Sequence, residues 1–483
     1  MGEGTVVAAI CMGFEVHQPF RLNRDFVPAM ARGRRDLKGC YFDPSNREIL
    51  DRVADRCYVP ATEIVLDALD GGMRCAFSLS GVLVEQLEQW RPDALALFAE
   101  VAAHKNAEVL AQTYYHSLAG FFADTGELSL QMKMHADLMH DLFGRVPAVA
   151  ENTEFALDNR IAAAVRDLGF SAVYTEGTDR LLGGRSPNET YTCGGLPLLL
   201  RNCPLSDDIA FRFSWTAWDK HPLTAETYAS WVARSPGRCA HVFIDYETFG
   251  EHHKEESGIL DFLEALPGAF DDAGVATLLP SEAAASPPAG EVSLDSPVSW
   301  ADLEKDASAW LGNPVQQSTF FALEHSPARA ARPDLWRYLG TSDHFYYLAR
   351  KNGSCGEVHR YFCPEGNDGS HDAYMRVLSH LEGRCLGRAR RSAASLPPDR
   401  AFHFCFPGGQ YAGVSAHSLR EFEEALERAP RESVWWHFDR GDYSRWVEGS
   451  VGDRRLARAV STCPTPDDVR EAVRARRCLL CGD

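Results

Sequence analysis

The chain lacks any uninterrupted apolar run approaching the roughly 20 residues that a helix needs to cross a bilayer, so no membrane partner is expected. It also lacks a surplus of basic residues, because 68 Asp and Glu outnumber 49 Lys and Arg and give a formal net charge of −19. Nucleic acids need a basic face for their phosphates, which excludes nucleic acid as a partner. An acidic surface suits an enzyme that acts on a neutral or cationic small molecule, or on a neutral polymer.

Cysteines are present without the arrangement of a zinc site. The 14 cysteines are scattered, and the CxxC pair of Cys478 and Cys481 offers two ligands where structural zinc needs four. The N-terminus has no basic segment before its apolar stretch, so that stretch is expected to be a core strand and not a signal peptide. We therefore expect a cytoplasmic protein with reduced cysteines and with no metal or other cofactor.

Short apolar, β-rich segments alternate with helical patterns through the first 280 residues. Such alternation predicts right-handed βαβ units and a parallel sheet, and seven units favour a barrel-like arrangement over an open sheet. The predicted strands are 6–11, 75–79, 108–111, 148–150, 172–174, 209–213 and 242–245, and the predicted helices between them include 94–104, 129–142 and 158–168.

The remaining sequence predicts two further parts. Residues 281–297 are small, polar and proline-rich, which is typical of a linker or a surface loop. Helical patterns follow at 300–311, 313–324, 335–339 and 371–381, and a second break falls at 395–400. The last segment has strand-like AFHFCF and SVWWHF around a helix at 418–428, which indicates a small α+β module. The predicted domains are therefore 1–280, 281–396 and 397–483.

The most informative motif is VFIDYETFGEHH at 242–253. Its β-branched start predicts a buried strand, and charged groups follow at once: Asp245, Glu247, Glu251, His252 and His253. Placing charges at a strand end costs solvation, which packing alone does not require. The motif indicates acid/base chemistry or a metal site.

Four other clusters carry polar groups, and three of them follow predicted strands. FEVHQPFRL (14–22) holds His17 and Gln18, QTYYHSL (112–118) holds Tyr114 and His116, ENTEFALDN (151–159) holds Glu154, and TSDHFYYL (341–348) holds Asp343 and His344. Taken singly, each has a structural interpretation: a hydrogen-bonded core histidine, a carboxylate at a helix N-terminus, or a helix cap. In a parallel barrel, however, groups at the carboxyl ends of strands converge on one face.

Two carboxylates from separate strands meet the needs of glycoside hydrolysis. One carboxylic acid protonates the leaving oxygen, and a second carboxylate acts on the other side of the anomeric carbon. Tyr114 and Trp218 would supply flat faces for sugar rings. Glu247 beside Asp245 would help to hold a proton on Asp245 near neutral pH.

Five blocks in this order, FEVHQPFRL, QTYYHSL, NTEFALDN, FIDYETFGEHH and SDHFYYL, resemble the signature of glycoside hydrolase family 57, most of all its α-amylase branch. SWADLEKDASAWLGN (299–313) is similar to the helical region of that branch. The resemblance spans about residues 5–385. It implies a distorted TIM-like (β/α)7 barrel, a helical subdomain, and action on α-1,4-glucans or maltooligosaccharides with retention of configuration.

The resemblance also implies roles for single residues. By motif match, Glu154 would be the nucleophile and Asp245 the general acid/base, and His17, His116 and Asp343 would contact the sugar around the cleavage point. The candidate substrate-binding residues, including one from the FRFS segment at 211–214, are His17, Gln18, Tyr114, His116, Arg212, Trp218, Glu247, His252, Asp343 and His344.

Two positions depart from the pattern of the branch. Gln112 stands where the branch commonly has Glu, which lowers the local negative charge and bears on hydroxyl contacts or on the acidity of Asp245. After FRFS, the chain has Trp215-Thr216-Ala217 where polar or basic residues are expected, which puts a sugar subsite in doubt. Neither departure touches the two carboxylates assigned to catalysis.

Three other functions are left open. The same residues would give a 4-α-glucanotransferase if the acceptor is a glucan instead of water. A metal-dependent hydrolase, such as a deacetylase, would use His17, Asp245, His252 and His253 as ligands. A catalytically dead glucan-binding barrel is the third alternative. In the last module, Trp435, Trp436 and Trp446 would form either a glucan platform or a small core. The oligomeric state is not predicted.

Overall fold

The computed structural model describes residues 9–34, 36–350, 369–393 and 395–481. The chain divides into two compact units. The first comprises Met1–Phe321 and Arg337–Tyr374, and the second comprises Ala322–Trp336 and Met375–Asp483. The predicted boundaries at 280 and 396 are not tested by this division and stay a prediction.

The first unit is built around a parallel sheet with strand order β3-β2-β1-β8-β7-β5-β4. After β3, Ala111 bridges Ala150 of β4, with its N–H donating to Val149 O at 3.0 Å and its carbonyl accepting from Glu151 N at 2.7 Å. This bridge joins the two edge strands, so the sheet curls into a distorted barrel and the predicted (β/α)7 class is confirmed. The strands are β1 (Ala9–Val16), β2 (Cys75–Leu79), β3 (Ala107–Val109), β4 (Val149–Glu151), β5 (Ala172–Glu176), β7 (Leu196–Arg201) and β8 (Cys239–Asp245), with short β6 (Tyr191–Cys193) and β9 (Ala276–Thr277) paired to β7 and β1.

Strand β1 shows how the sequence positions the site. Both of its faces are buried, as expected for the middle of a parallel sheet. Cys11 belongs to the core inside the barrel, and Glu15 on the same inner face reaches a cavity at the strand end. The predicted strand 6–11 was too short at its end, and residues 6–8 lie outside the described residues. The outward side chains pack into the outer core: Ile10, Met12, Phe14 and Val16.

The predicted strand at 209–213 is wrong. Helix α9 (Cys203–Ala210) runs into this segment, because Asn202 caps its start by accepting from Leu205 N at 3.1 Å and Pro204 occupies its first turn. The apolar and aromatic residues at 209–213 have the composition of a strand, but they end helix α9 and begin the turn that follows it.

The seventh strand of the barrel is β7, which the sequence prediction missed. Its Pro197 argues against an inner strand, since proline cannot donate to a ladder. Here Pro197 faces Thr192 of β6, and Gly194 and Gly195 form a two-residue turn with φ of 54° and 83°. A Gly-Gly pair between apolar runs is a hairpin signal, and it marked this strand.

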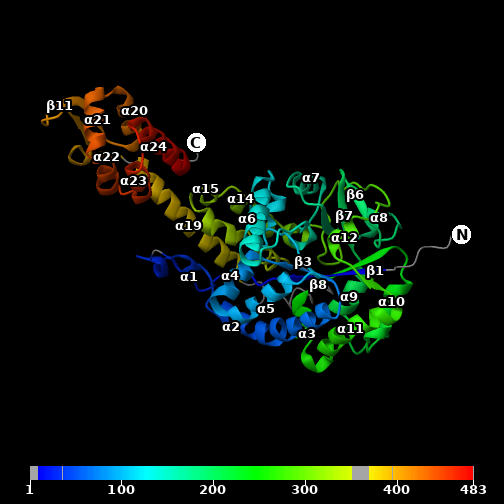
Figure 1. Ribbon diagram of the computed structural model, residues 1–483. Helices are drawn as coiled ribbons and strands as arrows, with labels where there is room; N and C mark the ends of the chain where they lie inside the picture. Colours follow the sequence, from blue (N-terminus) through cyan, green and yellow to red (C-terminus); the bar gives the residue numbers. More distant parts are fainter. Residues whose placement is uncertain (1–8, 35, 351–368, 394, 482–483) are drawn as a thin grey trace. The chain divides into compact units, whose positions relative to one another are not determined.

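Helices cover the outside of the sheet. Helices α10, α11, α3 and α5 follow one another around it, each in contact with the next (Figure 1). The predicted helices 94–104, 129–142 and 158–168 are confirmed as α5, α6 and α7. The helices of this part are α1 (Lys38–Tyr41), α2 (Ser45–Val53), α3 (Val59–Asp70), α4 (Gly81–Trp90), α5 (Pro92–Ala103), α6 (Gly126–Phe143), α7 (Asn159–Asp167), α8 (Asp179–Leu182), α9, α10 (Ala225–Arg234) and α11 (Ile259–Ala273).

The segment after the barrel is less helical than predicted. Within 300–311 only α13 (Ser308–Leu311) is helical, because Asp302 and Lys305 take left-handed φ of 54° and 52°, which an α-helix does not contain. Residues 281–297 pack on the barrel with Leu294 buried, so they are no free linker. The helices here are α12 (Pro280–Ala284), α13, α14 (Pro314–Glu324), α15 (Ala328–Ala331), α16 (Pro333–Trp336), α17 (Ser342–Tyr346) and α19 (Ser370–Ala393), which confirm the patterns at 313–324, 335–339 and 371–381.

The second unit has its own core and is mostly helical. SVWWHF, predicted as a strand, lies in α21, where Val434 and His437 are buried one helical turn apart. Trp446 is buried in the same core, so the three tryptophans do not form one exposed platform. The remaining elements are β10 (Phe402–Cys405), β11 (Tyr411–Ala416), α20 (Leu419–Arg428), α21 (Arg431–Asp439), α22 (Asp442–Trp446), α23 (Arg454–Ser461) and α24 (Pro466–Cys481).

Across the part of the chain that the structure describes, none of the helices combines the length and the apolar character that a bilayer span requires.

Candidate active site

A cavity of about 670 Å³ opens at the carboxyl ends of the barrel strands. Its walls come from the ends of β1, β7 and β8, from the turn after β4, and from the region around Trp300 and α17. Most of the predicted site residues therefore meet in one place. The predicted residues in the lining are His17, Gln18, His116, Glu154, Arg212, Asp245, Glu247, His252 and Asp343.

Glu154 sits on a single 3-10 turn (Thr153–Phe155) directly after β4. Its Oε2 accepts a hydrogen bond from Trp300 Nε1 at 2.7 Å, and its Oε1 accepts one from Ser342 Oγ at 2.8 Å. His116 Nε2 lies 3.6 Å from Oε1. Both carboxylate oxygens are thus held in place from three separate segments of the chain.

Backbone strain concentrates around this group. Positive φ angles are rare outside glycine, and they persist at functional sites where surrounding contacts enforce them. The non-glycine residues with positive φ among the described ones are His116, Glu154, Phe155, Asp302 and Lys305. All but Phe155 line the cavity, and Phe155 follows the carboxylate in the chain.

Asp245 ends strand β8 and faces the cavity. Burial raises its pKa from 3.8 to about 8, the negative charges of Glu247 and Glu154 add to the rise, and Arg201 opposes it. This carboxyl therefore holds its proton at neutral pH, which suits a group that donates a proton.

Glu247 also lines the cavity and is 5% exposed. Burial raises its pKa to about 7, although the Tyr58 hydroxyl, which donates to Glu247 Oε1, works in the opposite direction. The turn from the strand into this region depends on Gly250, whose φ of 118° brings it so close to Arg56 O that a Cβ would lie 1.9 Å away.

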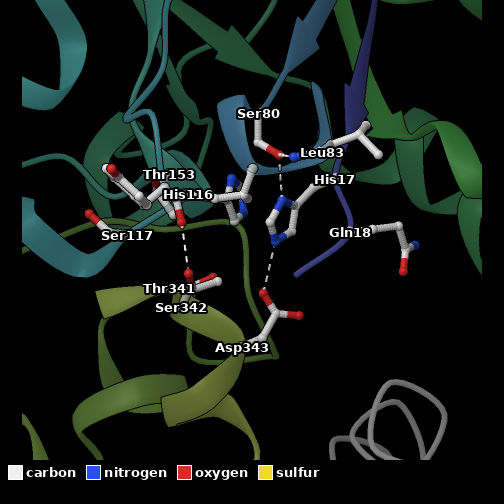
Figure 2. Close-up of polar contacts among 12 residues, drawn as sticks. His17, Gln18, Ser80, Leu83, His116, Ser117, Thr153, Thr341, Ser342 and Asp343 are labelled. Carbon is white, nitrogen blue, oxygen red and sulfur yellow. Dashed lines mark hydrogen bonds and ion pairs between the residues drawn. The ribbon is translucent and has the colours of Figure 1, made fainter. Parts of the chain in front are cut away.

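His17 joins two distant segments, as Figure 2 shows. Its Nε2 lies 3.0 Å from Asp343 Oδ2, and its Nδ1 lies 2.7 Å from Ser80 Oγ. Burial would raise the pKa of Asp343, but its interactions with His17 outweigh burial and hold that pKa well below the ordinary range. Burial lowers the pKa of His17 to about 4, with repulsion from His116 adding to the effect. A neutral imidazole therefore donates Nε2–H to Asp343 and accepts at Nδ1 from Ser80, whose oxygen also caps α4 by accepting from Leu83 N at 3.3 Å.

His116 stacks on His17 with 4.0 Å between ring centroids. Burial lowers the pKa of His116, but contact with Glu154 outweighs burial and the net shift is upward. Its Nδ1 donates to Gln112 Oε1 at 2.8 Å, because an amide oxygen can only accept. The two rings thus differ in their hydrogen-bond roles.

Gln112 is buried behind His116 and is not part of the cavity lining. Its amide nitrogen donates to Glu15 Oε1 at 2.9 Å and to Ser78 Oγ at 2.8 Å, while its oxygen serves His116. A carboxylate here would have no proton to give to Glu15. The expected effect on sugar hydroxyls is therefore not direct, and Gln112 acts through the histidine.

Glu15 and Glu151 are buried carboxyls that the sequence analysis did not select. Burial raises the pKa of both groups, in the case of Glu151 to about 7. Ser78 Oγ lies 3.3 Å from Glu151 Oε2 and links it to the Gln112 network. Alternate side chains of a strand face the same side, and in β1 this places Glu15 on the same face as residue 17. This alternation could have identified Glu15 from the sequence.

Arg201 is the other functional candidate that was missed, because strand β7 was missed. At the end of that strand it pairs with Glu176 at 2.9 Å and with Asp207 at 2.7 Å, and its Nε donates to Phe243 O at 2.7 Å. It lines the cavity and is almost fully buried. If β7 had been predicted, the position of Arg201 at its carboxyl end would have identified this residue as a site candidate.

Three predicted contact residues lie outside the cavity lining. Tyr114 donates its hydroxyl to Glu85 at 3.0 Å, and its ring covers Gly81. Trp218 packs edge-on against Trp231. His344 is buried with its ring against Tyr374. The motif placed these side chains near the site, but packing directs them elsewhere.

The predicted metal ligands do not converge. His253 Nδ1 lies 2.8 Å from Ser214 Oγ, and its Nε2 lies 3.0 Å from Ile209 O, so both ring nitrogens are engaged. Within the described ranges, no three of the cavity's His, Cys, Asp and Glu side chains bring their ligand atoms together closely enough for one ion. The arrangement favours carboxylate chemistry over the metal-dependent alternative.

Comparison with known proteins agrees with this geometry. The model of glycosyl hydrolase family 57 matches residues 11–294. A protein of Methanocaldococcus jannaschii described as "Putative alpha-amylase" is 39% identical over 395 residues, covering 77% of this chain and 83% of that protein.

Two branching enzymes share the fold. The crystal structure of TK1436 from Thermococcus kodakaraensis has a TM-score of 0.59 at 13% identity and covers 88% of this chain and 94% of its own. The GH57-type enzyme of Pyrococcus horikoshii has a TM-score of 0.57 at 14% identity and covers 80% and 90%. At such identities the match concerns the fold alone.

Proposed function

This chain belongs to glycoside hydrolase family 57, and we propose that it cleaves α-1,4-glucosidic bonds in starch- or glycogen-type glucans and maltooligosaccharides by double displacement. The relative described as "Putative alpha-amylase" supports the choice of substrate. The observation that carries the proposal is the pair of carboxyl groups, Glu154 and Asp245, in one cavity and in different surroundings. Retaining hydrolysis requires such a pair.

Glu154 is the nucleophile of the proposal. The hydrogen bonds from Trp300 and Ser342 fix the direction of its carboxylate. Attack on the anomeric carbon forms a glycosyl-enzyme ester while the bond to the leaving oxygen breaks.

Asp245 is the acid and then the base. With its pKa near 8 it is protonated at neutral pH and gives its proton to the leaving glycosidic oxygen. The carboxylate that remains takes a proton from water, and the resulting hydroxide cleaves the ester, which restores both groups. Transfer to a glucan hydroxyl instead of water would make the same site a 4-α-glucanotransferase.

The His17–Asp343 pair and His116 hold the sugar at the cleavage point in this proposal. Asp343 is ionised and accepts from sugar hydroxyls with its remaining lone pairs, while the neutral His17 keeps it in place. The contact with Glu154 raises the pKa of His116 despite burial, which favours a positive charge on the imidazole beside that carboxylate.

The proposal is tested by incubating the protein with maltoheptaose and with soluble starch, with and without EDTA, and resolving products by chain length. Shorter sugars alone would support hydrolysis, and sugars longer than the input would support transfer. Glu154→Gln and Asp245→Asn should each lower kcat by roughly 10²–10⁴, whereas the variant Glu264→Gln, at an exposed position of α11, should retain activity. Full activity in either cavity variant would contradict the assignment.

Azide separates the two roles. With an activated aryl α-maltoside, azide should enter the space left by Glu154→Ala and attack the anomeric carbon directly, which yields a β-glycosyl azide. In Asp245→Ala, azide should attack the glycosyl-enzyme and yield the α-glycosyl azide. Exchanged products would mean that the nucleophile and the acid/base are assigned the wrong way round.

A further inference from the structure

A second cluster of chemically active side chains lies inside the barrel, at the end opposite the catalytic cavity. Cys11 of β1 and Cys239 and His241 of β8 point into the inner core, and Cys11 stands directly opposite His241 in the strand register. All three are nine-tenths buried or more. Their ligand atoms lie within 4.8 Å of one another, and among the described residues no other His, Cys, Asp and Glu group meets that criterion.

The sulfur separation fits a shared metal ion. Cys11 Sγ and Cys239 Sγ are 3.8 Å apart, and both cysteines are free thiols. Two thiolates bound tetrahedrally to zinc at about 2.3 Å are separated by about 3.8 Å. Two thiols packed without a metal can also lie this far apart, so the sulfur separation alone does not identify a zinc site. The surroundings of the His241 imidazole distinguish the two cases.

His241 provides the independent observation. Its Nε2 is buried and has no hydrogen-bond partner among the described residues, while its Nδ1 lies 3.4 Å from the Tyr174 hydroxyl. Buried imidazole nitrogens are normally satisfied, so an orphaned one requires an explanation. Histidines that bind metals use one nitrogen for the ion and hold the other with a second group, here Tyr174.

Glu108 supplies further negative charge. Its Oε2 accepts from Ser281 N at 3.0 Å, but its Oε1 is also buried and unpartnered among the described residues. The carboxylate is close enough to Cys11 and Tyr174 to act on both electrostatically. A divalent cation would stabilise this charge, which otherwise faces an apolar core.

We propose that Cys11, Cys239 and His241 bind one zinc ion that cross-links β1 to β8. Thiolate and imidazole ligands select zinc among the common divalent ions, and water completes the coordination. Binding releases the two thiol protons to solvent and changes no oxidation state.

The proposed ion is structural and does not depend on the catalytic assignment. An aromatic layer of Phe155, Tyr174 and Phe243, with centroids 4.8 to 5.8 Å apart, lies between the cluster and the carboxyl ends of the strands. The ion therefore has no route to the sugar. Its effect is on the stability of the barrel.

The test measures zinc in the full-length protein, expressed with zinc supplementation and then dialysed against metal-free buffer. We expect about one zinc per chain in the wild type. Cys11→Ala, Cys239→Ala and His241→Ala should each lose it. The matched variant Cys75→Ala, which removes an equally buried strand thiol outside the cluster, and the double variant at Cys478 and Cys481 should keep it.

Two measurements guard against variants that fail to fold. Chelation of the wild type under mild denaturant should lower its unfolding midpoint, and added zinc should restore it. Cobalt added to the apoprotein should give a thiolate charge-transfer band that Cys75→Ala retains and Cys11→Ala lacks. Zinc far below one per chain, or equal content in the cluster variants and the control, would overturn the proposal.

Discussion

The raised pKa of Asp245 has a thermodynamic consequence that can be measured without substrate. In the unfolded chain this carboxyl titrates near 3.8, whereas in the folded barrel its pKa is about 8. Between these values the folded state binds a proton that the unfolded state has lost, so stability falls as pH rises. Asp245→Asn has no such proton. The variant should therefore be inactive and yet more stable than the wild type.

The size of the effect follows from the pKa shift. Each pH unit between about 4 and 8 removes up to about 1.4 kcal/mol from the wild type, so the difference reaches at most about 4 kcal/mol at pH 7. Above the folded pKa the difference becomes constant. Because the side chain faces an open cavity and is only partly buried, we expect roughly half of this limit. For a unit of this size, about 2 °C per kcal/mol then gives a rise of a few degrees in the unfolding midpoint.

The assay is thermal unfolding of both proteins at pH 5, 6, 7 and 8. Asp343→Asn is the matched control in the same cavity. Its carboxyl has a depressed pKa, so its stabilisation is fully present above the unfolded value and is lost only as pH falls through the folded one. Asp343→Asn should be less stable than the wild type by a nearly constant amount from pH 5 to 8.

An Asp245→Asn midpoint at or below that of the wild type at pH 8 would contradict the raised pKa of Asp245. A difference that stays flat or shrinks from pH 5 to pH 8 would refute it as well. Either result would mean that burial does not hold the proton on this group.

Three further predictions concern the groups around the site. Glu247→Gln removes a carboxylate that raises the pKa of Asp245, so the basic limb of the kcat/KM profile should move down by on the order of one pH unit; an unchanged limb would contradict this. Gln112→Glu removes the hydrogen-bond donor to Glu15 and adds a buried carboxyl group, so the free energy of unfolding should fall by about 3 kcal/mol at neutral pH. The decrease should be smaller at acidic pH, where the new carboxyl group is protonated. Ser80→Ala loses an N-cap worth about 1 kcal/mol and the hydrogen-bond partner of His17, so the unfolding midpoint should fall and the KM for maltoheptaose should rise. A lower midpoint with an unchanged KM would contradict a role of His17 in substrate binding.

The pattern of the amino-acid sequence was enough to predict the barrel class and the two candidate catalytic carboxylates. VFIDYETFGEHH begins with an apolar, β-branched run that predicts a strand, and charged residues follow it directly. Glu154 likewise follows an apolar segment. Since the carboxyl ends of parallel strands face one direction, local pattern was enough to bring Asp245 and Glu154 together. The strand of 75–79 was likewise predicted at its true bounds, because a short apolar run between turn signals leaves little choice.

The groups that surround those carboxylates could be identified only from the folded chain. Trp300 reaches Glu154 across 146 positions of sequence, from a segment that the pattern predicted as helix. Arg201 was not predicted because Pro197 argued against a strand at 196–201. In the structure that proline pairs with Thr192 of the hairpin strand β6. Hydrogen bonds between distant segments leave no periodic trace in the chain. The sequence could therefore place charges at strand ends, but the partners that orient them and shift their pKa values depend on long-range packing.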